Sequence, residues 1–229
     1  MNTNLWLITA KTNLHVGNEN ASNYGIIDKA VQRDVLTDLP CINSSSLKGA
    51  VNEYCARNTE VDLLKVFGSD KINKSKGSQK GSAIFFDAKL LYLPVQDEVN
   101  LFHYATSDAV IAQLKDRLSV FGLSVDETEL RSVLVPGHGV EVMSAAAFGE
   151  MCKDENLPVI ARNVLENGRS DNLWYEQVIP AETVFFAVIQ EEGEELSNAL
   201  DGDGDGTIIQ IGANATIGYG YCRFTKVAL

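Results

Sequence analysis

A glycine-rich segment near the C-terminus constrains the fold of this chain most strongly. It runs from Ile209 to Gly220 and reads Ile-Gln-Ile-Gly-Ala-Asn-Ala-Thr-Ile-Gly-Tyr-Gly. Its flanks, residues 208–211 and 219–224, have the composition of β-strands. Its glycines permit positive φ angles and let another segment approach the backbone closely. The segment therefore predicts a strand, a glycine-rich loop and a second strand.

Two interpretations of this loop are open. It is either a glycine-bent hairpin or barrel corner, or a loop whose backbone N–H groups meet a phosphate. In the second case the phosphate would lie against Asn214, Thr216 and Gly218. The spacing matches neither the dinucleotide fingerprint nor the phosphate-loop pattern, because no Gly-Lys-Ser/Thr follows.

Composition limits the class of protein. With 229 residues, 45% of them apolar, the chain can form one large or two small domains. It contains no apolar run of about 18 residues, and its N-terminal segment lacks the basic region of a signal peptide. Four cysteines without Cys-x-x-Cys spacing predict free thiols in a reducing cytosol. We therefore expect a cytoplasmic protein with no membrane partner.

The charge is distributed unevenly. The net charge is -12, which argues against nucleic acid if it is taken as an average. Residues 1–80, however, carry ten Lys/Arg and eight Asp/Glu, whereas the rest carries nine and twenty-three. This distribution predicts one face that accepts a polyanion and another that repels it.

Hydrophobic patterns predict an α+β fold with a projecting hairpin. The loop at 17–40 is too long for an ordinary connection, which is typical of functional loops. The turn of the projecting hairpin contains Asn167-Gly168, which favours a type I′ turn, within a loop that we expect to exceed two residues. We expect a strand at 4–11, a helix at 44–55, a bent strand or hairpin closed by Pro94 at 83–95, a helix at 108–121, hairpin arms at 157–164 and 173–179, and a buried strand at 183–189.

The start of the helix at 44–55 is a candidate phosphate site. Ser45 and Ser46 are good N-cap residues, and Lys48 adds a positive charge one turn into the helix. A helix N-terminus presents free N–H groups and the positive end of its dipole to an anion. The alternative is an ordinary capped helix with a solvated lysine.

Five segments in order resemble one known family. They are Leu14-His-Val-Gly17 leading to Gly25-Ile-Ile-Asp-Lys29, residues 39–49, residues 85–95, Leu173-Trp-Tyr-Glu176 leading to residues 180–186, and the glycine-rich loop. Together they resemble the backbone subunit of type III-B CRISPR effector complexes, in the RAMP (repeat-associated mysterious protein) superfamily. The resemblance spans most of the chain.

The resemblance implies a single domain over residues 1–229, with an RRM-like (ferredoxin-like) palm and a β-hairpin thumb at about 157–177. Such subunits stack into a helical filament along a guide CRISPR RNA, beside other type III-B effector subunits. A complementary single-stranded target RNA pairs with the guide and is cut once per subunit. Each cut requires an acidic residue in the long loop and a divalent metal, Mg²⁺ or Mn²⁺.

Asp28 matches the acidic cleavage residue of the family. Attack of a 2′-hydroxyl on the phosphate needs in-line geometry, charge neutralisation and removal of a proton, and a carboxylate can act as base or hold a hydrated metal ion. Without the resemblance, a loop aspartate is usually a turn residue. Lys29 and Arg33 can hold phosphates, and His15 either contacts RNA or forms hydrogen bonds within the loop.

The hairpin at 157–177 corresponds to the thumb, which inserts apolar side chains between guide and target bases at each kink. Val164 and Leu165 are the candidate wedge residues, and Arg162 and Arg169 suit nearby phosphates. The alternative is an ordinary edge hairpin.

Three competing functions are open. One is a scaffold that coats the guide RNA without cleaving. Another is a processing endonuclease of the same superfamily, which would use a histidine-based site. The third is a Ca²⁺-responsive protein, because residues 201–206 (Asp-Gly-Asp-Gly-Asp-Gly) imitate half of an EF-hand loop. The bidentate glutamate of that loop is missing, since Gly212 occupies its position.

Overall fold

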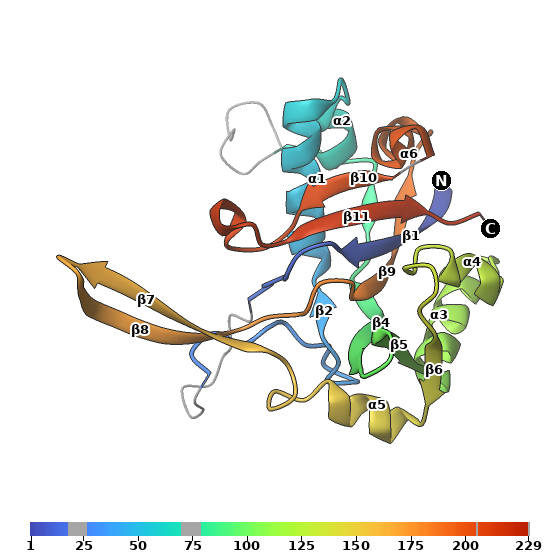
Figure 1. Ribbon diagram of the computed structural model, residues 1–229. Helices are drawn as coiled ribbons and strands as arrows, with labels where there is room; N and C mark the ends of the chain where they lie inside the picture. The colour runs from blue at the N-terminus through green and yellow to red at the C-terminus, as the bar shows by residue number, and fades with distance from the viewer. Residues whose placement is uncertain (18–26, 70–78, 205, 229) are drawn as a thin grey trace.

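The computed structural model describes residues 1–17, 27–69, 79–204 and 206–228, except for the side chains of Leu165 and Asp203. The described residues form a mixed α+β structure around a nine-stranded sheet, with a separate two-stranded hairpin, β7–β8. The hairpin projects far from the rest of the molecule (Figure 1). The expected α+β class and its projection are confirmed.

The elements have the following bounds. The strands are β1 (Asn2–Ala10), β2 (Cys41–Ile42), β3 (Ile84–Phe85), β4 (Ala88–Asp97), β5 (Leu101–Ser107), β6 (Val140–Met143), β7 (Val159–Glu166), β8 (Arg169–Gln177), β9 (Val184–Glu191), β10 (Thr207–Gln210) and β11 (Tyr221–Lys226). The helices are α1 (Ser44–Asn58), α2 (Leu63–Phe67), α3 (Asp108–Ser119), α4 (Glu127–Arg131), α5 (Ala145–Met151) and α6 (Glu195–Asp201), with the short 3₁₀ turns η2 (Gly202–Gly204) and η3 (Ala215–Ile217).

The large sheet has the strand order β10-β11-β1-β9-β4-β5-β6, with β2 paired to β4 and β3 paired to β9. Its named strand pairs are antiparallel except β5–β6, which is parallel. The central strands β1 and β9 are continuous apolar runs, buried over residues 5–10 and 184–189. Such runs are typical of strands that are covered on both faces.

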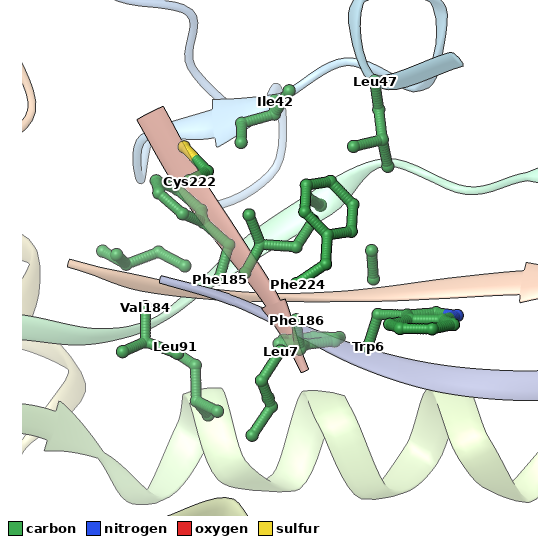
Figure 2. Packing of buried hydrophobic residues seen from close by; sticks show 14 of the residues in the cluster. Trp6, Leu7, Ile42, Leu47, Leu91, Val184, Phe185, Phe186, Cys222 and Phe224 are labelled. Carbon is green, nitrogen blue, oxygen red and sulfur yellow. The ribbon is translucent and has the colours of Figure 1, made fainter. Parts of the chain in front are cut away.

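Helices cover both faces of this sheet. Figure 2 shows Phe185 on the same side as Leu47 of α1, while a helix lies against the opposite side. That second helix is α3, because its Arg117 guanidinium lies 5.8 Å from the ring centroid of Phe186. Successive residues of a strand point to opposite faces, so Phe185 and Phe186 serve the two layers of the core. The molecule therefore presents no bare sheet face at these central strands.

One expected element is wrong in part. Residues 83–95 do not form a hairpin, because β3 and β4 both pair with β9 rather than with each other. The bent-strand alternative is correct, with a register shift between Leu90 and Tyr92. Pro94 lies inside β4 instead of closing a turn. The pairing of β4 with β9 ends at Tyr92, so the absent N–H of Pro94 interrupts no bond to β9.

The thumb hairpin has a tighter turn than expected. Strand β7 ends at Glu166 and β8 begins at Arg169, so the loop contains only Asn167 and Gly168. Their φ angles are 51° and 79°, as a type I′ turn requires. The prediction of the turn type is confirmed and the prediction of a longer loop is wrong, because residues 165–170 continue the ladder after a register shift at Val164.

All four cysteines are buried free thiols. Burial raises the pKa of Cys41 to about 11, and the pKa values of Cys152 and Cys222 to about 12. At neutral pH these groups are neutral thiols, and they pack as small apolar side chains. No helix among the described residues is long and apolar enough to cross a bilayer.

Candidate functional site

Asp28 is attached to the thumb. Its carboxylate Oδ2 accepts a hydrogen bond of 2.7 Å from the backbone N–H of Tyr175 in β8. In return the Asp28 N–H donates to the Tyr175 carbonyl at 3.0 Å. The side chain remains exposed to solvent. The carboxylate is therefore held in a fixed orientation at the base of the thumb, open to an approaching ligand.

The residues after Asp28 continue along the same strand. The Gln177 N–H donates to the Lys29 carbonyl at 2.9 Å, and the side-chain Oε1 of Gln177 accepts the N–H of Val31 at 3.0 Å. Gln177 is fully buried. The segment 28–31 thus lies beside β8 like an additional strand, which fixes the middle of the long loop to the thumb.

A buried carboxylate joins the thumb to the glycine-rich loop. Glu176 is 1% exposed. Its Oε1 accepts a hydrogen bond from the Asn214 amide, and its Oε2 lies 3.4 Å from the Arg162 guanidinium. Arg162 in turn donates to Asn214 Oδ1 at 2.5 Å. Sequence reasoning did not single out Glu176 as a site residue, although the Leu-Trp-Tyr-Glu segment that carried the family resemblance contains it.

The aromatic ring of Trp174 lies close to two cations. The Lys29 ammonium is 4.9 Å and the Arg162 guanidinium 5.5 Å from the ring centroid. Both distances are within the range of cation–π attraction. Trp174 was likewise not predicted as a site residue. Asp28, Lys29, Arg162 and Asn214 therefore lie in connected segments at the base of the thumb.

The glycine-rich loop is a shaped turn between β10 and β11. A Cβ on Gly220 would lie 2.0 Å from the Ile211 carbonyl oxygen, and one on Gly212 would lie 2.3 Å from the His15 carbonyl oxygen. Both glycines have positive φ. Several N–H groups of the loop already donate to backbone carbonyls, among them those of Ala213 and Gly218. The close packing and the positive φ angles of the turn thus explain why glycine occupies these positions. This favours the hairpin interpretation over a loop built only for phosphate.

His15 lies inside the molecule and is 4% exposed. Its Nδ1 is 2.7 Å from the Gln177 carbonyl oxygen and 3.8 Å from Glu176 Oε1. A carbonyl only accepts hydrogen bonds, so Nδ1 carries a proton. This position favours hydrogen bonding within the protein over direct contact with RNA.

Arg33 also makes contacts within the protein. It forms an ion pair of 2.7 Å with Asp154 and donates to the Asp38 carbonyl at 2.7 Å. The Gln177 side chain donates to the same Asp154 carboxylate at 3.1 Å. Arg33 therefore joins the long loop to the chain just before the thumb, and it does not join the Asp28 cluster.

The remaining predicted residues lie away from Asp28. The N-cap of α1 is Asn43, so the prediction of Ser45 and Ser46 as N-cap residues is wrong: both lie inside the first turn, and Lys48 follows it. At this helix end Asp87 Oδ1 already accepts the N–H of Ser44 at 2.8 Å. An incoming phosphate at this helix end would share the N–H groups with a carboxylate. In the outer half of the thumb, the Val164 side chain is 46% exposed and Arg169 is also exposed. The side chain of Leu165 is outside the described part. Thr216 and Gly218 are exposed on the glycine-rich loop.

The profile of the RAMP superfamily matches residues 7–223, nearly the whole chain. The chain belongs to the RAMP superfamily. Its relatives include the Cmr endoribonuclease Cmr4 of Pyrococcus furiosus, 24% identical over 262 aligned positions that cover 88% of each chain. The Csm endoribonuclease Csm3 of Streptococcus thermophilus is 31% identical over 128 positions, which cover 48% of this chain and 57% of Csm3.

Solved RAMP structures share this fold. A chain of the type III-B Cmr-β complex bound to cognate target RNA superimposes with a TM-score of 0.75 at 19% identity, over 99% of this chain and 97% of that one. Oligomeric Cmr4 from Pyrococcus furiosus gives a TM-score of 0.72 at 20% identity, over 98% and 97%. The architecture described above is therefore shared with a chain of the Cmr-β complex and with Cmr4.

The fit of this RAMP site to a divalent metal rests on few donors. Among the described residues, no three His, Cys, Asp or Glu side chains group as metal ligands. Mg²⁺, however, often binds through one or two carboxylates and keeps several waters, with substrate phosphates completing its shell. Asp28 could serve as the single carboxylate ligand of a Mg²⁺ ion bound in this way. In the acidic segment 201–206, for which Ca²⁺ binding was an alternative, Asp205 and the Asp203 side chain lie outside the described part.

Proposed function

We propose that this chain is the repeating backbone subunit of a type III-B CRISPR guide-RNA effector complex, and that it cleaves target RNA paired to the guide at regular intervals. One observation carries the proposal. The exposed carboxylate of Asp28 is anchored to the thumb strand by Tyr175, and the cations Lys29 and Arg162 lie at the ring of the neighbouring strand residue, Trp174. The relationship to Cmr4, which is named an endoribonuclease, supports the same activity.

Asp28 is the proposed catalytic residue. Target cleavage requires a carboxylate that is open to the RNA and does not move relative to the hairpin that distorts the RNA. The exposure of Asp28 leaves its carboxylate open to the RNA. The hydrogen bond from Tyr175 fixes the carboxylate relative to the hairpin. A bound Mg²⁺ or Mn²⁺ would neutralise charge at the phosphate, with Asp28 as its protein ligand. Lys29 and Arg162 would attract the flanking phosphates.

We propose that the palm is an RRM-like (ferredoxin-like) core, and the strand order supports this. Strands β11, β1, β9 and β4 are neighbours in that order, α1 lies between β1 and β4 in sequence, and α6 lies between β9 and β11. This is the order of the split β-α-β unit. Because α3 covers the sheet face opposite α1, RNA would bind along the loops and the thumb instead of on the sheet.

The guide RNA would contact Lys48 with Ser45 and Ser46, the glycine-rich loop at Asn214, Thr216 and Gly218, and the arginines of the thumb. Lys48 forms no ion pair within the described part of the chain, so its charge is available to a phosphate. Val164 and Leu165 would separate bases at each kink. Further copies of this chain and other type III-B subunits would complete the complex in the cytoplasm.

A scaffold that coats the guide without cleaving is the second candidate. It is favoured by the small number of metal donors near Asp28 among the described residues. In that case the Asp28–Tyr175 hydrogen bonds would serve only to fasten the loop to the thumb. The folded palm and the guide contacts would be the same, so only a cleavage measurement separates the two functions.

The test is a cleavage assay with the assembled guide complex, end-labelled complementary RNA and Mg²⁺. Wild-type protein should give evenly spaced cuts, and Asp28→Ala should abolish them while target binding persists. Unchanged cutting by Asp28→Ala would move the chemistry to another residue or subunit. Tight binding without any cutting by the wild-type complex would identify the scaffold.

A further inference from the structure

The environment of Trp174 gives this tryptophan a second task besides packing. We propose that Trp174 is a positioning residue, whose ring holds the Lys29 ammonium at the base of the thumb for contact with a target phosphate. This inference rests on the proposed cleavage function and assigns a part of it to a residue outside the predicted site.

The two cations on the ring are held differently. Arg162 has fixed partners besides the ring, namely Asn214 Oδ1 at 2.5 Å and Glu176 Oε2 at 3.4 Å. For the Lys29 ammonium, the ring is the sole interaction found within the described part of the chain. The backbone of Lys29 is fixed by its bonds to β8, but its long side chain is otherwise free to rotate. The ring of Trp174 therefore decides where this charge is placed.

Strand register keeps the ring itself in place. Trp174 lies directly opposite Arg162 in the β7–β8 ladder, and Lys29 forms a parallel bridge with Glu176, two residues further along β8. Residues at i and i+2 of a strand point to the same face, so the four side chains share one face of the thumb base. The indole Nε1–H also lies 3.4 Å from Glu176 Oε2. The contacts with Arg162 and Glu176 restrain the indole ring, so the ring can in turn restrain the mobile Lys29 ammonium.

The contact leaves the ammonium able to bind an anion. An ammonium group has three N–H donors, and a ring can occupy only the side that faces it. The opposite side can donate to a phosphate oxygen. Lys29 and Asp28 are fixed to neighbouring residues of β8, so a phosphate bound by the ammonium would belong to the stretch of target RNA that lies against the base of the thumb. Correct placement of reacting groups is a large part of catalysis, so a misplaced Lys29 should slow the cut more than it weakens binding.

The experiment is a double-mutant cycle in the assembled complex, measuring single-turnover cleavage of end-labelled target RNA. It compares wild type, Trp174→Leu, Lys29→Gln and the double variant. Cation–π attraction at an exposed site predicts that Trp174→Leu lowers the rate about two- to fivefold. In the Lys29→Gln background, Trp174→Leu should cause no further loss, because the charge that it positions is already absent. Lys115→Gln, on α3 and paired with Glu127 at 2.8 Å, is the matched control and should cut at the wild-type rate.

The outcomes separate the two proposals. If the wild-type complex does not cut, the cleavage function fails and the inference fails with it. If it cuts, a wild-type rate for Trp174→Leu, or an equal loss with and without Lys29, overturns the positioning role. If Trp174→Leu prevents assembly, the cycle is repeated with Trp174→Phe. Its smaller ring predicts a smaller loss, which must again vanish in the Lys29→Gln background.

Discussion

Asp28 and Tyr175 are joined in both directions: the Asp28 N–H donates to the Tyr175 carbonyl, and the Tyr175 N–H donates to the Asp28 carboxylate. The two residues are 147 positions apart in the sequence. The pair connects the long loop after β1 with the second strand of the thumb. It therefore fastens the loop that carries the proposed catalytic carboxylate to the hairpin that carries the proposed wedge residues.

Replacing Asp28 by asparagine separates the two tasks of this carboxylate. Asp28→Asn keeps an oxygen that accepts the Tyr175 N–H, but it removes the negative charge. We expect the cleavage rate to fall by about 100-fold or more, while the Tm of the isolated chain stays within about 2 °C of wild type. Cleavage kinetics and thermal unfolding check this directly. A large drop in Tm would mean that the charge of Asp28 maintains the fold.

Replacing Lys48 tests the guide contact at the start of α1. If its ammonium neutralises one phosphate, Lys48→Gln should weaken guide-RNA binding at low salt, and the slope of log K against log salt should fall by about 1. Binding titrations at several salt concentrations measure this slope. Lys115→Gln removes the same charge from α3 and serves as the control. An unchanged slope for Lys48→Gln would leave Lys48 as a solvated helix residue.

The glycine-rich loop should respond differently at its different glycines. Gly218 and Gly220 have nearly the same positive φ, 85° and 80°. A Cβ on Gly218 meets nothing within 4 Å, whereas one on Gly220 would overlap the Ile211 carbonyl oxygen at 2.0 Å. Gly218→Ala should cost about 1–2 kcal/mol of unfolding free energy from backbone strain, and Gly220→Ala should cost more because the backbone must also move. Denaturant unfolding measures both, and equal costs would contradict the close approach at Gly220.

The ion pair of Asp34 with Lys89 predicts a loss of stability in acid. Burial raises the pKa of Asp34, but hydrogen bonds from Lys89 and Thr37 lower it more, so the pKa lies below its ordinary value. A carboxyl group with a lowered pKa stabilises the fold above its unfolded pKa, about 3.9, and this stability is lost as the pH falls through the folded pKa. Asp34→Asn should reduce the free energy of unfolding at pH 7 and flatten its fall below about pH 4.

The cost of Asp34→Asn at pH 7 should reach about 3 kcal/mol, because it removes one partner of a largely buried ion pair. Asp87, 3.4 Å from the same ammonium, compensates for part of this loss. Glu127→Gln, which breaks an exposed pair with Lys115, is the control and should cost below about 1 kcal/mol. Unfolding curves at several pH values compare the two variants. Equal costs at every pH would contradict a stabilising role for the Asp34–Lys89 pair.

Much of the local structure could be predicted from short-range patterns. The helix expected at 44–55 is present as α1, with Leu47, Val51 and Cys55 buried at intervals of four residues, and Asn167-Gly168 predicted the thumb turn. The partner of each strand was harder to predict, because pairing depends on segments far apart in the sequence. The region 83–95 shows this: its composition predicts strand, but only the fold shows that β9 is the common partner of β3 and β4.

The candidate site could be predicted only in part for the same reason. Asp28, Lys29, Arg162 and Asn214 were chosen individually, and the structure brings them together. Glu176 and Trp174 were missed because a buried carboxylate and a strand tryptophan look ordinary in a sequence. Their partners come from three separate segments: residues 28–31, β7 and the glycine-rich loop. Arg33 and His15 look like RNA ligands by residue type, but their neighbours in the fold already satisfy them.

The anchor at Tyr175 and the turn at Asn167-Gly168 lie at opposite ends of the same hairpin. The length of the hairpin can therefore change without changing the position of the Asp28 carboxylate. Adding one residue to each arm beside the turn would lengthen the hairpin by about 3.4 Å, whereas adding residues to one arm alone would shift the pairing register. Neither change would displace Asp28. A relative with a longer or shorter hairpin would thus keep this carboxylate at the same place relative to the base of the hairpin.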